Sequence, residues 1–138
     1  MDDELEQQLF DDYPIFYTHR HRSPDEYDPP VPTIVMDGIA CGDGWYVLLD
    51  ALGHLIETNV NNHGKRDDVH AIQVKQKWGG LRIYTEPMPE FVYGITRFAE
   101  TMSRHIGEAC GTMQNVDQRD VDGWQWALCP DCDPPRNY

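Results

Sequence analysis

Four side chains in the last third of the chain have the types and spacing of metal ligands. Cys129 and Cys132 form a C-x2-C pair, and His105 and Cys110 precede them. Two thiolates separated by two residues can hold one tetrahedral ion, because the tight turn between them brings both sulfur atoms to the same side. His105, Cys110, Cys129 and Cys132 therefore predict a zinc site, structural or vestigial, in a C-terminal zinc-knuckle-like element.

Other interpretations of these residues stay open. A thiolate three residues before Cys110 would complete a four-cysteine pattern, but that position is Gly107, and His105 is the nearest substitute. A protonated histidine at the end of a helix is also stabilised by the helix dipole without a metal. A disulfide or free structural thiols are therefore the alternatives. A redox function is disfavoured, because Pro134 and Pro135 end any helix that the C-x2-C pair would open.

The composition is strongly and unevenly acidic. The 138 residues include 24 acidic and 11 basic side chains, for a formal net charge of -13. Residues 1–28 hold nine acids and two bases, residues 29–107 are nearly neutral, and residues 108–138 are acidic again. This excess of negative charge opposes direct binding to DNA or RNA, which needs clustered Lys and Arg. The acids either keep the protein soluble or occupy a basic surface on a partner, as a nucleic-acid mimic does.

The apolar periodicity predicts an α+β domain over 34–138, preceded by an acidic N-terminal arm and Pro-rich linker over 1–33. Two helices, at about 44–59 and 90–106, are expected to pack on a small antiparallel sheet built around a hairpin at 71–85. The expected core residues are Trp45, Leu49, Leu52, Ile72, Val74, Ile83, Phe91, Ile95 and Phe98. No segment resembles a membrane span or an export signal, so a cytoplasmic protein is expected.

Two groups of residues are candidates for binding a partner. The first group combines acids with aromatic anchors in the N-terminal arm: Asp2, Asp3, Glu4, Glu6, Asp11, Asp12, Tyr13, Phe16 and Tyr17. The second group, the hairpin patch, interleaves cations with rings: Lys75, Lys77, Trp78, Arg82 and Tyr84. Cations among rings suit phosphates or stacked bases. Lysines on the solvent face of a strand also prevent aggregation, however, so the hairpin patch is the secondary candidate.

Distinctive motifs occur along nearly the whole chain. They are Phe10-Asp-Asp-Tyr13-Pro14-x-Phe16, His19-Arg-His-Arg22, Gly38-Ile-Ala-Cys-Gly-Asp-Gly-Trp45, Gln73-Val-Lys-Gln-Lys-Trp-Gly-Gly-Leu-Arg-Ile-Tyr84 and Gly123-Trp124 followed by Leu128-Cys129. Together these stretches resemble a family of small uncharacterised proteins of tailed phages, prophages and bacteria. In that family a C-x2-C pair precedes a later cysteine and a second ligand three positions on, whereas Gly107 replaces the first cysteine here. The resemblance implies a phage setting and a zinc-knuckle fold, and it supplies no catalytic residue.

These observations favour a binding protein over an enzyme. No phosphate loop, nucleophile elbow or metalloprotease helix occurs in the sequence. The first hypothesis is a noncatalytic phage-type effector that binds and inhibits a host protein, by mimicking nucleic acid on the basic groove of a nuclease, polymerase or topoisomerase. The alternative is a small zinc-finger adaptor that binds protein or RNA through the hairpin patch. Neither hypothesis involves a membrane.

Overall fold

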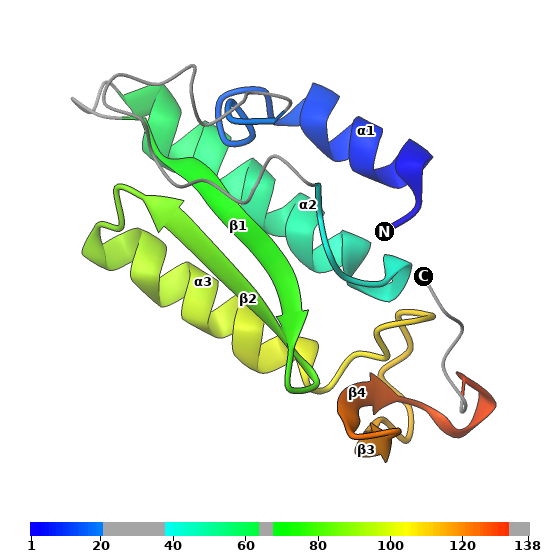
Figure 1. Ribbon diagram of the computed structural model, residues 1–138. Helices are drawn as coiled ribbons and strands as arrows, with labels where there is room; N and C mark the ends of the chain where they lie inside the picture. The colour runs from blue at the N-terminus through cyan, green and yellow to red at the C-terminus, as the bar shows by residue number, and fades with distance from the viewer. Residues whose placement is uncertain (21–37, 64–67, 133–138) are drawn as a thin grey trace.

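A computed structural model describes residues 1–20, 38–63 and 68–132 of the chain. These residues form three α-helices and two antiparallel hairpins: α1 (Asp3–Asp12), α2 (Tyr46–Leu55), α3 (Glu90–Ser103), β1 (His70–Lys77) with β2 (Gly80–Glu86), and β3 (Asp117–Val121) with β4 (Trp124–Leu128). Figure 1 shows α2 behind β1, α3 alongside β2, and β3–β4 near the turn of the first hairpin. The predicted α+β class is confirmed. The predicted linker and the boundary between 33 and 34 lie outside the described residues.

Helix α1 is packed into the domain instead of forming a separate arm. Its start is capped by Asp2, whose side chain accepts a hydrogen bond from the backbone of Glu4. Leu9 and Phe10 are buried in the same hydrophobic core as Trp45 at the start of α2. The apolar spacing gives α1 one hydrophobic side, and this side packs against the core.

The β1–β2 hairpin buries one face and exposes the other. Val74 and Ile83 are cross-strand partners, and both are buried. A bulge between Ala71 and Gln73 shifts the register, so that Ala71 is fully buried and Ile72 only half-buried. The prediction of Ile72 as a core residue is corrected by this bulge, because one extra residue reverses which side chains point inward.

The turns of both hairpins use residues with positive φ. Trp78 and Gly79 have φ values of 55° and 65°, and Asp122 and Gly123 have values of 53° and 82°. Two successive positive values are typical of type I′ turns, which match the twist of the flanking strands. The first turn lies one residue earlier than the Gly79-Gly80 pair suggests, so Gly80 begins β2.

Helix α3 closes the free edge of β2. The side chain of Ser103 accepts a hydrogen bond of 2.9 Å from the backbone N–H of Leu81, and a carboxylate oxygen of Glu100 accepts one of 3.0 Å from Ile83. Both acceptor side chains are buried. These bonds satisfy edge amides that would otherwise be open to another strand.

This contact rotates the predicted apolar stripe of α3 away from the core. Val92 and Ala99 face inward, and Ile95 is half-buried, whereas Phe91 and Phe98 are 51% and 68% exposed. The assignment of Phe91 and Phe98 to the core is therefore wrong. Small inward residues allow the helix to approach β2 closely enough for its polar side chains to reach the strand. The other predicted core residues are buried: Trp45, Leu49, Leu52, Val74 and Ile83.

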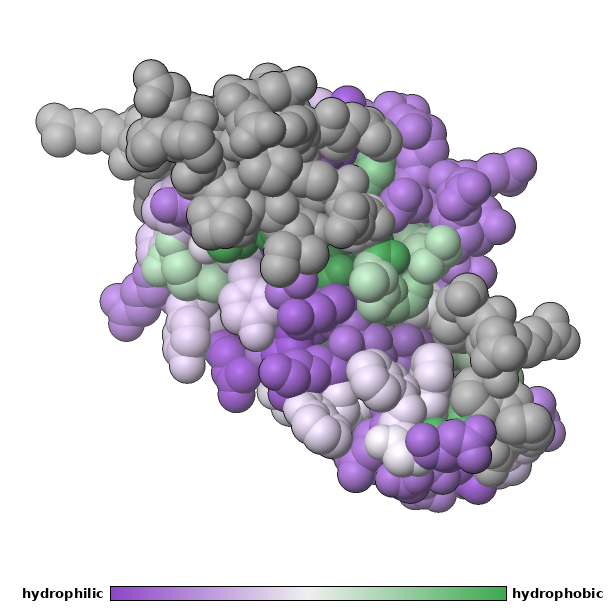
Figure 2. All heavy atoms as spheres, in the orientation of Figure 1, coloured by the Kyte–Doolittle hydropathy of each residue, from purple (hydrophilic) through white to green (hydrophobic). Residues whose placement is uncertain are grey.

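The hairpin face opposite the core is largely polar. In Figure 2, hydrophilic and intermediate residues cover most of the described surface over the hairpin and β3–β4. Lys75 and Arg82, which are cross-strand partners, lie on this outer face of the sheet. Within the described ranges, no helix has the length and apolar character needed to cross a membrane.

Candidate metal centre and charged surfaces

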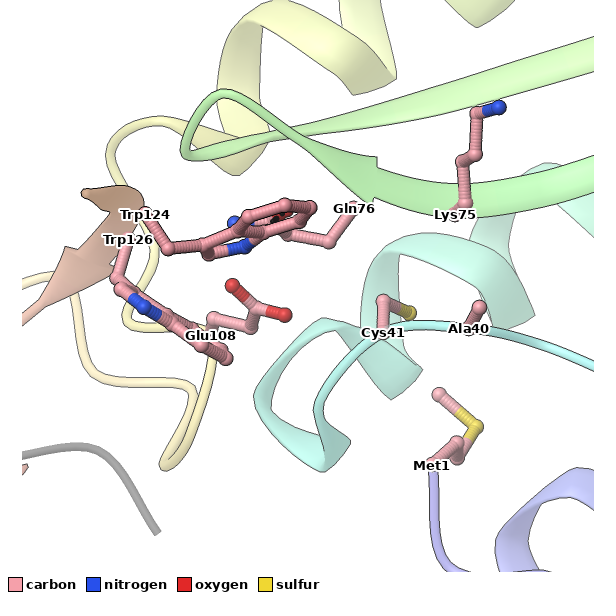
Figure 3. A pocket seen from close by; sticks show the side chains of 8 residues that line it. All are labelled: Met1, Ala40, Cys41, Lys75, Gln76, Glu108, Trp124 and Trp126. Atoms are coloured by element: carbon pink, nitrogen blue, oxygen red, sulfur yellow. Dashed lines mark hydrogen bonds between the residues drawn. The ribbon is translucent and has the colours of Figure 1, made fainter. Parts of the chain in front are cut away.

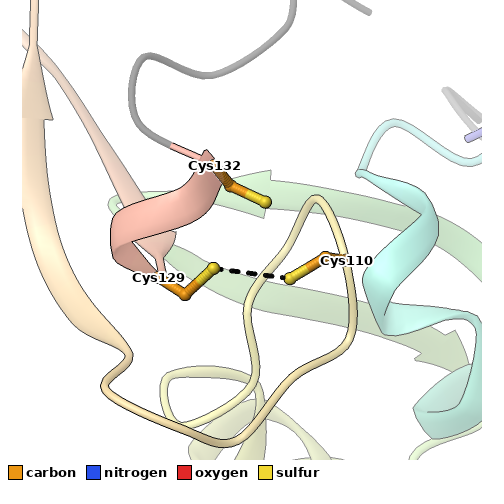
Figure 4. A group of neighbouring side chains, drawn as sticks. All are labelled: Cys110, Cys129 and Cys132. Carbon is orange, nitrogen blue, oxygen red and sulfur yellow. Dashed lines mark hydrogen bonds between the residues drawn. The ribbon is translucent and has the colours of Figure 1, made fainter.

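Three of the four predicted metal ligands come together. The sulfur atoms of Cys110, Cys129 and Cys132 all lie within 4.8 Å of one another. Figure 4 shows the three side chains gathered at one place. The Cys110 and Cys129 sulfurs are 3.7 Å apart. That separation matches the edge of a zinc–thiolate tetrahedron, about 3.8 Å for Zn–S bonds of about 2.3 Å. The three cysteines can therefore hold a metal ion after a small closure of the cluster.

Short turns place these three thiols. Cys129 follows β4 directly, and the 3-10 turn Pro130–Cys132 returns Cys132 to it through a 3.1 Å backbone bond from Cys132 N to Cys129 O. Cys110 lies in a turn closed by its own N–H and Gly107 O, 3.3 Å apart. The two ligand segments are thus a loop after α3 and the end of the second hairpin.

The thiols differ in how readily they lose a proton. Burial by itself raises the pKa of Cys129, but hydrogen bonds from Cys110 and from the backbone of Asp131 lower it overall. Burial and the neighbouring thiols raise the pKa of Cys132 to about 12. A metal ion must therefore displace at least the Cys132 proton at neutral pH, as thiolate ligation requires.

His105 is not part of this cluster. It is exposed, and its backbone N–H bonds to Met102 O in the turn that ends α3. Gly107 lies beside the cluster, because a Cβ atom built there would make a tight contact of 3.1 Å with the sulfur of Cys110. The prediction of His105 as a ligand is corrected: the helix ends two residues before it, and its side chain lies on the outside of the turn.

The Cys-Gly-Asp-Gly-Trp motif clamps the loop that carries Cys110. Gly44 N donates to Glu108 O at 2.8 Å, and the indole of Trp45 donates to Ile106 O at 2.9 Å. A Cβ atom on Gly44 would overlap the backbone oxygen of Gly107. Glycine is needed here because two backbones meet without room for a side chain.

Glu108 is the buried acid of this clamp. The residue is only 1% exposed, and one of its carboxylate oxygens accepts a 3.1 Å hydrogen bond from the backbone N–H of Gly42. Within the described parts of the chain, the other oxygen accepts no hydrogen bond of normal geometry. Burial raises the pKa of Glu108 to about 7, although the Gly42 bond opposes this shift. A buried carboxylate that is only half satisfied is costly for the fold.

The second motif contacts the same C-terminal region. The hairpin turn carries Gly79, where a Cβ atom would overlap the side chain of Gln118 on β3. The amide of Gln76 donates to Gln125 O, and its oxygen accepts a 3.0 Å bond from the indole of Trp124. The Cys-Gly-Asp-Gly-Trp motif therefore holds the loop that carries Cys110, and the hairpin motif holds the strand that leads to Cys129.

The predicted acidic residues lie on α1, but they do not form one uniform group. Asp2 caps the helix, and Glu6 is half-buried and accepts a bond from the backbone of Ile39. The remaining acids are exposed on the outer side of α1, with two glutamines between them: Asp3, Glu4, Asp11 and Asp12, with Gln7 and Gln8. The two ion pairs found within the described residues, Arg97–Glu100 and Arg119–Asp117, involve none of these acids.

The predicted aromatic anchors are buried. Tyr13 is 8% exposed, and Phe16 and Tyr17 are fully buried. The Tyr13 hydroxyl donates to Asp50 at 2.6 Å, and the ring of Tyr17 packs against those of Phe10 and Phe16. These rings are core residues and not surface anchors, because packing beneath α1 removes their large apolar area from water, whereas a position beside its acids would leave that area exposed.

Several residues of the hairpin patch lie close together on the β1–β2 hairpin. Lys75 and Arg82 face each other across the strands, and the Lys75 ammonium lies 5.8 Å from the ring centroid of Tyr84. Lys77 is exposed at the strand end, and Trp78 is exposed in the turn. Like charges directly opposite each other are unfavourable unless an anion screens them.

Sequence reasoning missed Glu108 and the pair Trp124 and Trp126. The alternation of two tryptophans on one strand was a usable signal, because residues two apart on a strand share a face. The burial of Glu108 depends on tertiary contacts with Gly42 and was not visible in the sequence. No protein-family model matches the chain, and comparisons with curated proteins and with solved structures found no significant match.

Proposed function

We propose that this chain is a noncatalytic phage-type effector that binds and inhibits a host protein through the exposed acids of α1. The observation that carries the proposal is their presentation: Asp3, Glu4, Asp11 and Asp12 are exposed on a helix whose opposite side is locked into the core by Leu9 and Phe10. A fixed acidic surface loses less entropy on binding than a flexible tail does. The packing of α1 against the core therefore supports a function in partner recognition over a purely solubilising one.

The partner would have a basic groove, as in a nuclease, polymerase or topoisomerase. Asp3–Glu4 and Asp11–Asp12 are separated by eight residues, or about 12 Å along a helix that rises about 1.5 Å per residue. That spacing is close to the width of the DNA major groove, about 12 Å. Two pairs of carboxylates at this distance suit cationic side chains that otherwise contact phosphates. The resemblance to phage proteins supports a host-cell cytoplasm as the place of action.

Capture from a host lysate tests this proposal. The test variant carries Asp3→Asn, Glu4→Gln, Asp11→Asn and Asp12→Asn, and it keeps the Asp2 cap. A control carries four neutralised acids from exposed positions elsewhere: Glu86→Gln, Glu90→Gln, Asp117→Asn and Asp122→Asn. Both variants have the same net charge, so a difference between them reflects position. Capture should be lost only in the α1 variant, and capture by the unmodified chain should weaken as salt rises.

The adaptor hypothesis has one specific observation in its favour. Lys75 and Arg82 oppose each other without an ion pair among the described residues, next to the exposed rings of Tyr84 and Trp78. A Lys75→Gln, Arg82→Gln variant separates the two functions. If it loses the captured protein or RNA while the α1 variant keeps it, the effector proposal is wrong and the hairpin patch is the binding surface.

We also propose that the metal is zinc and that its function is structural. Three thiolates with a sulfur separation near that of a zinc tetrahedron support zinc over ions that prefer oxygen ligands. The loop that carries Cys110 is clamped by the Cys-Gly-Asp-Gly-Trp motif, as expected if the ion stabilises the C-terminal region. Elemental analysis of protein purified without added metal should give about one zinc per chain. Metal-free protein of unchanged stability would contradict this assignment.

A further inference from the structure

A cavity of about 540 Å³ lies between β1, the segment 40–41 and β4. Its size is within the range of small-molecule sites, about 300–1,000 Å³. Figure 3 shows its wall, which includes Met1, Ala40, Cys41, Glu108, Trp124 and Trp126. The metal cluster lies outside this cavity, because none of Cys110, Cys129 and Cys132 lines it.

Glu108 provides a hydrogen-bond acceptor inside the cavity. The residue is 1% exposed, and its Oε1 atom is held by Gly42 N. Among the described residues, its Oε2 atom makes no hydrogen bond of normal geometry, although the side chain of Gln76 lies nearby. Glu108 forms no ion pair within the described part of the chain. Buried polar groups are nearly always hydrogen-bonded, so an unpartnered carboxylate oxygen in a cavity indicates a missing donor.

Two indoles flank this carboxylate. Trp124 and Trp126 project from the same face of β4, and Figure 3 shows the Glu108 carboxylate between their rings. The Trp124 ring is held by its bond to Gln76, whose own amide is held by Gln125 O. The faces of aromatic rings attract cations. The cavity therefore combines one carboxyl acceptor with the exposed ring of Trp124, beside Trp126.

The positive charges near the cavity each have contacts of their own. Arg119, the cross-strand partner of Trp126, is already engaged in an interaction. Lys75 lines the cavity, but its ammonium lies over the ring of Tyr84, and in Figure 3 it points away from Glu108. The terminal amine of Met1 donates to Ile39 O at 3.3 Å. The Met1 amine and the side chain of Gln76 both lie near enough to influence the Glu108 carboxyl, but neither completes a hydrogen bond to Oε2 among the described residues, so a ligand can supply that donor.

We propose that this cavity binds a guanidinium group, stacked on Trp124 beside Trp126 and donating to Glu108. A guanidinium is planar, which suits an indole face, and it is less strongly hydrated than an ammonium, so burial costs it less. It also carries several N–H donors, whereas a quaternary ammonium has none to give Glu108. The site is independent of the proposed host partner, because it requires only this cavity.

The test uses propylguanidinium and its uncharged analogue propylurea, which has nearly the same shape. Binding to the full chain is followed by the NMR shifts of the four indole N–H groups, which report separately on each tryptophan. Trp124 and Trp126 should shift, whereas Trp45 and Trp78, which do not line the cavity, should not. A dissociation constant on the order of millimolar is expected for so small a ligand, and propylurea should bind at least tenfold more weakly.

Two variants locate the interaction. Glu108→Gln keeps the size of the side chain and should weaken propylguanidinium binding by about ten- to hundredfold, the effect of a charged hydrogen bond. Trp124→Leu should also weaken it, whereas Trp78→Leu should not, and the two residues are similarly exposed, at 55% and 59%. Equal binding of urea and guanidinium, or unchanged binding by folded Glu108→Gln, would overturn the proposal.

A final comparison distinguishes a free ligand from a protein side chain. Agmatine represents a small guanidinium compound, and the capped peptide Gly-Arg-Gly represents arginine in a protein, with Gly-Lys-Gly as the matched peptide. Tighter binding of agmatine assigns the cavity to a small molecule. Tighter binding of the arginine peptide assigns it to a protein. Binding of the lysine peptide as tightly as the arginine peptide would refute selectivity for guanidinium.

Discussion

Completion of the metal site at Gly107 is the sharpest test of how this chain uses its cysteines. Gly107→Cys would add a thiol where a Cβ atom lies 3.1 Å from the sulfur of Cys110, and the backbone at Gly107 has no positive φ that would oppose a side chain. The Cys110–Cys129 separation of 3.7 Å already fits a zinc tetrahedron. The Cβ contact with Cys110 is tight, so the Cys110 sulfur must shift slightly before the added thiol can convert three ligands into four.

The expected effect can be estimated. Loss of groups that only orient metal ligands costs about 10- to 100-fold in affinity, so a new direct ligand should strengthen zinc binding by about 100-fold or more. This ratio corresponds to about 2.7 kcal/mol. When zinc exceeds both dissociation constants, the same free energy is added to folding stability. For a chain of this length the melting temperature should rise by about 10 °C.

The assay is thermal unfolding in buffered zinc with a reductant, together with competition against a chelator. Gly107→Ala is the matched control, because it introduces the same Cβ atom near Cys110 without a ligand. Gly107→Cys should exceed Gly107→Ala in zinc affinity and in zinc-dependent stability, and the two should be similar without metal. Equal zinc affinity of the two variants would refute the prediction that a thiol at position 107 becomes a fourth ligand. Extra stability without zinc would instead indicate thiol packing.

Three further predictions follow from the packing. Leu9→Ala should lower the free energy of unfolding by about 2–5 kcal/mol in urea denaturation, because Leu9 is fully buried, and a result near zero would show that α1 is a dispensable arm. Ser103→Ala should cost about 1–3 kcal/mol in the same measurement, since it leaves the buried N–H of Leu81 without its acceptor; an unchanged value would mean that water replaces the hydroxyl. Gly44→Ala should destabilise the protein because its Cβ atom meets the 107–111 backbone, whereas Gly94→Ala, with open space around it, should stabilise α3 by about 1 kcal/mol; the reverse order of melting temperatures would contradict the clamp.

The sequence determined the elements and part of the metal site. Helical spacing predicted α2 and α3, alternation predicted the β1–β2 hairpin, and the C-x2-C pair predicted that Cys129 and Cys132 would share a ligand cluster with Cys110. These features are local, or depend on a ligand spacing that fixes geometry over a few residues.

Tertiary contacts decided which side of each element is buried. A bulge moved Ile72 out of the core, and the polar contacts of α3 with β2 turned Phe91 and Phe98 outward. Periodicity gives the faces of a helix but not which face another element will cover. The choice depends on the total free energy of all contacts, including edge amides that only α3 can satisfy.

The candidate sites show the same division. Sequence spacing brought Cys129 and Cys132 together, but the exclusion of His105 and the approach of Gly107 to Cys110 depend on where the chain turns after α3. The carboxylate of Glu108 became a cavity group only because Gly42, far away in the sequence, holds one of its oxygens. Residue types and short spacings are fixed by the sequence, whereas burial and long-range hydrogen bonds are fixed by the folded chain, since they arise between segments whose separation in sequence carries no geometric information.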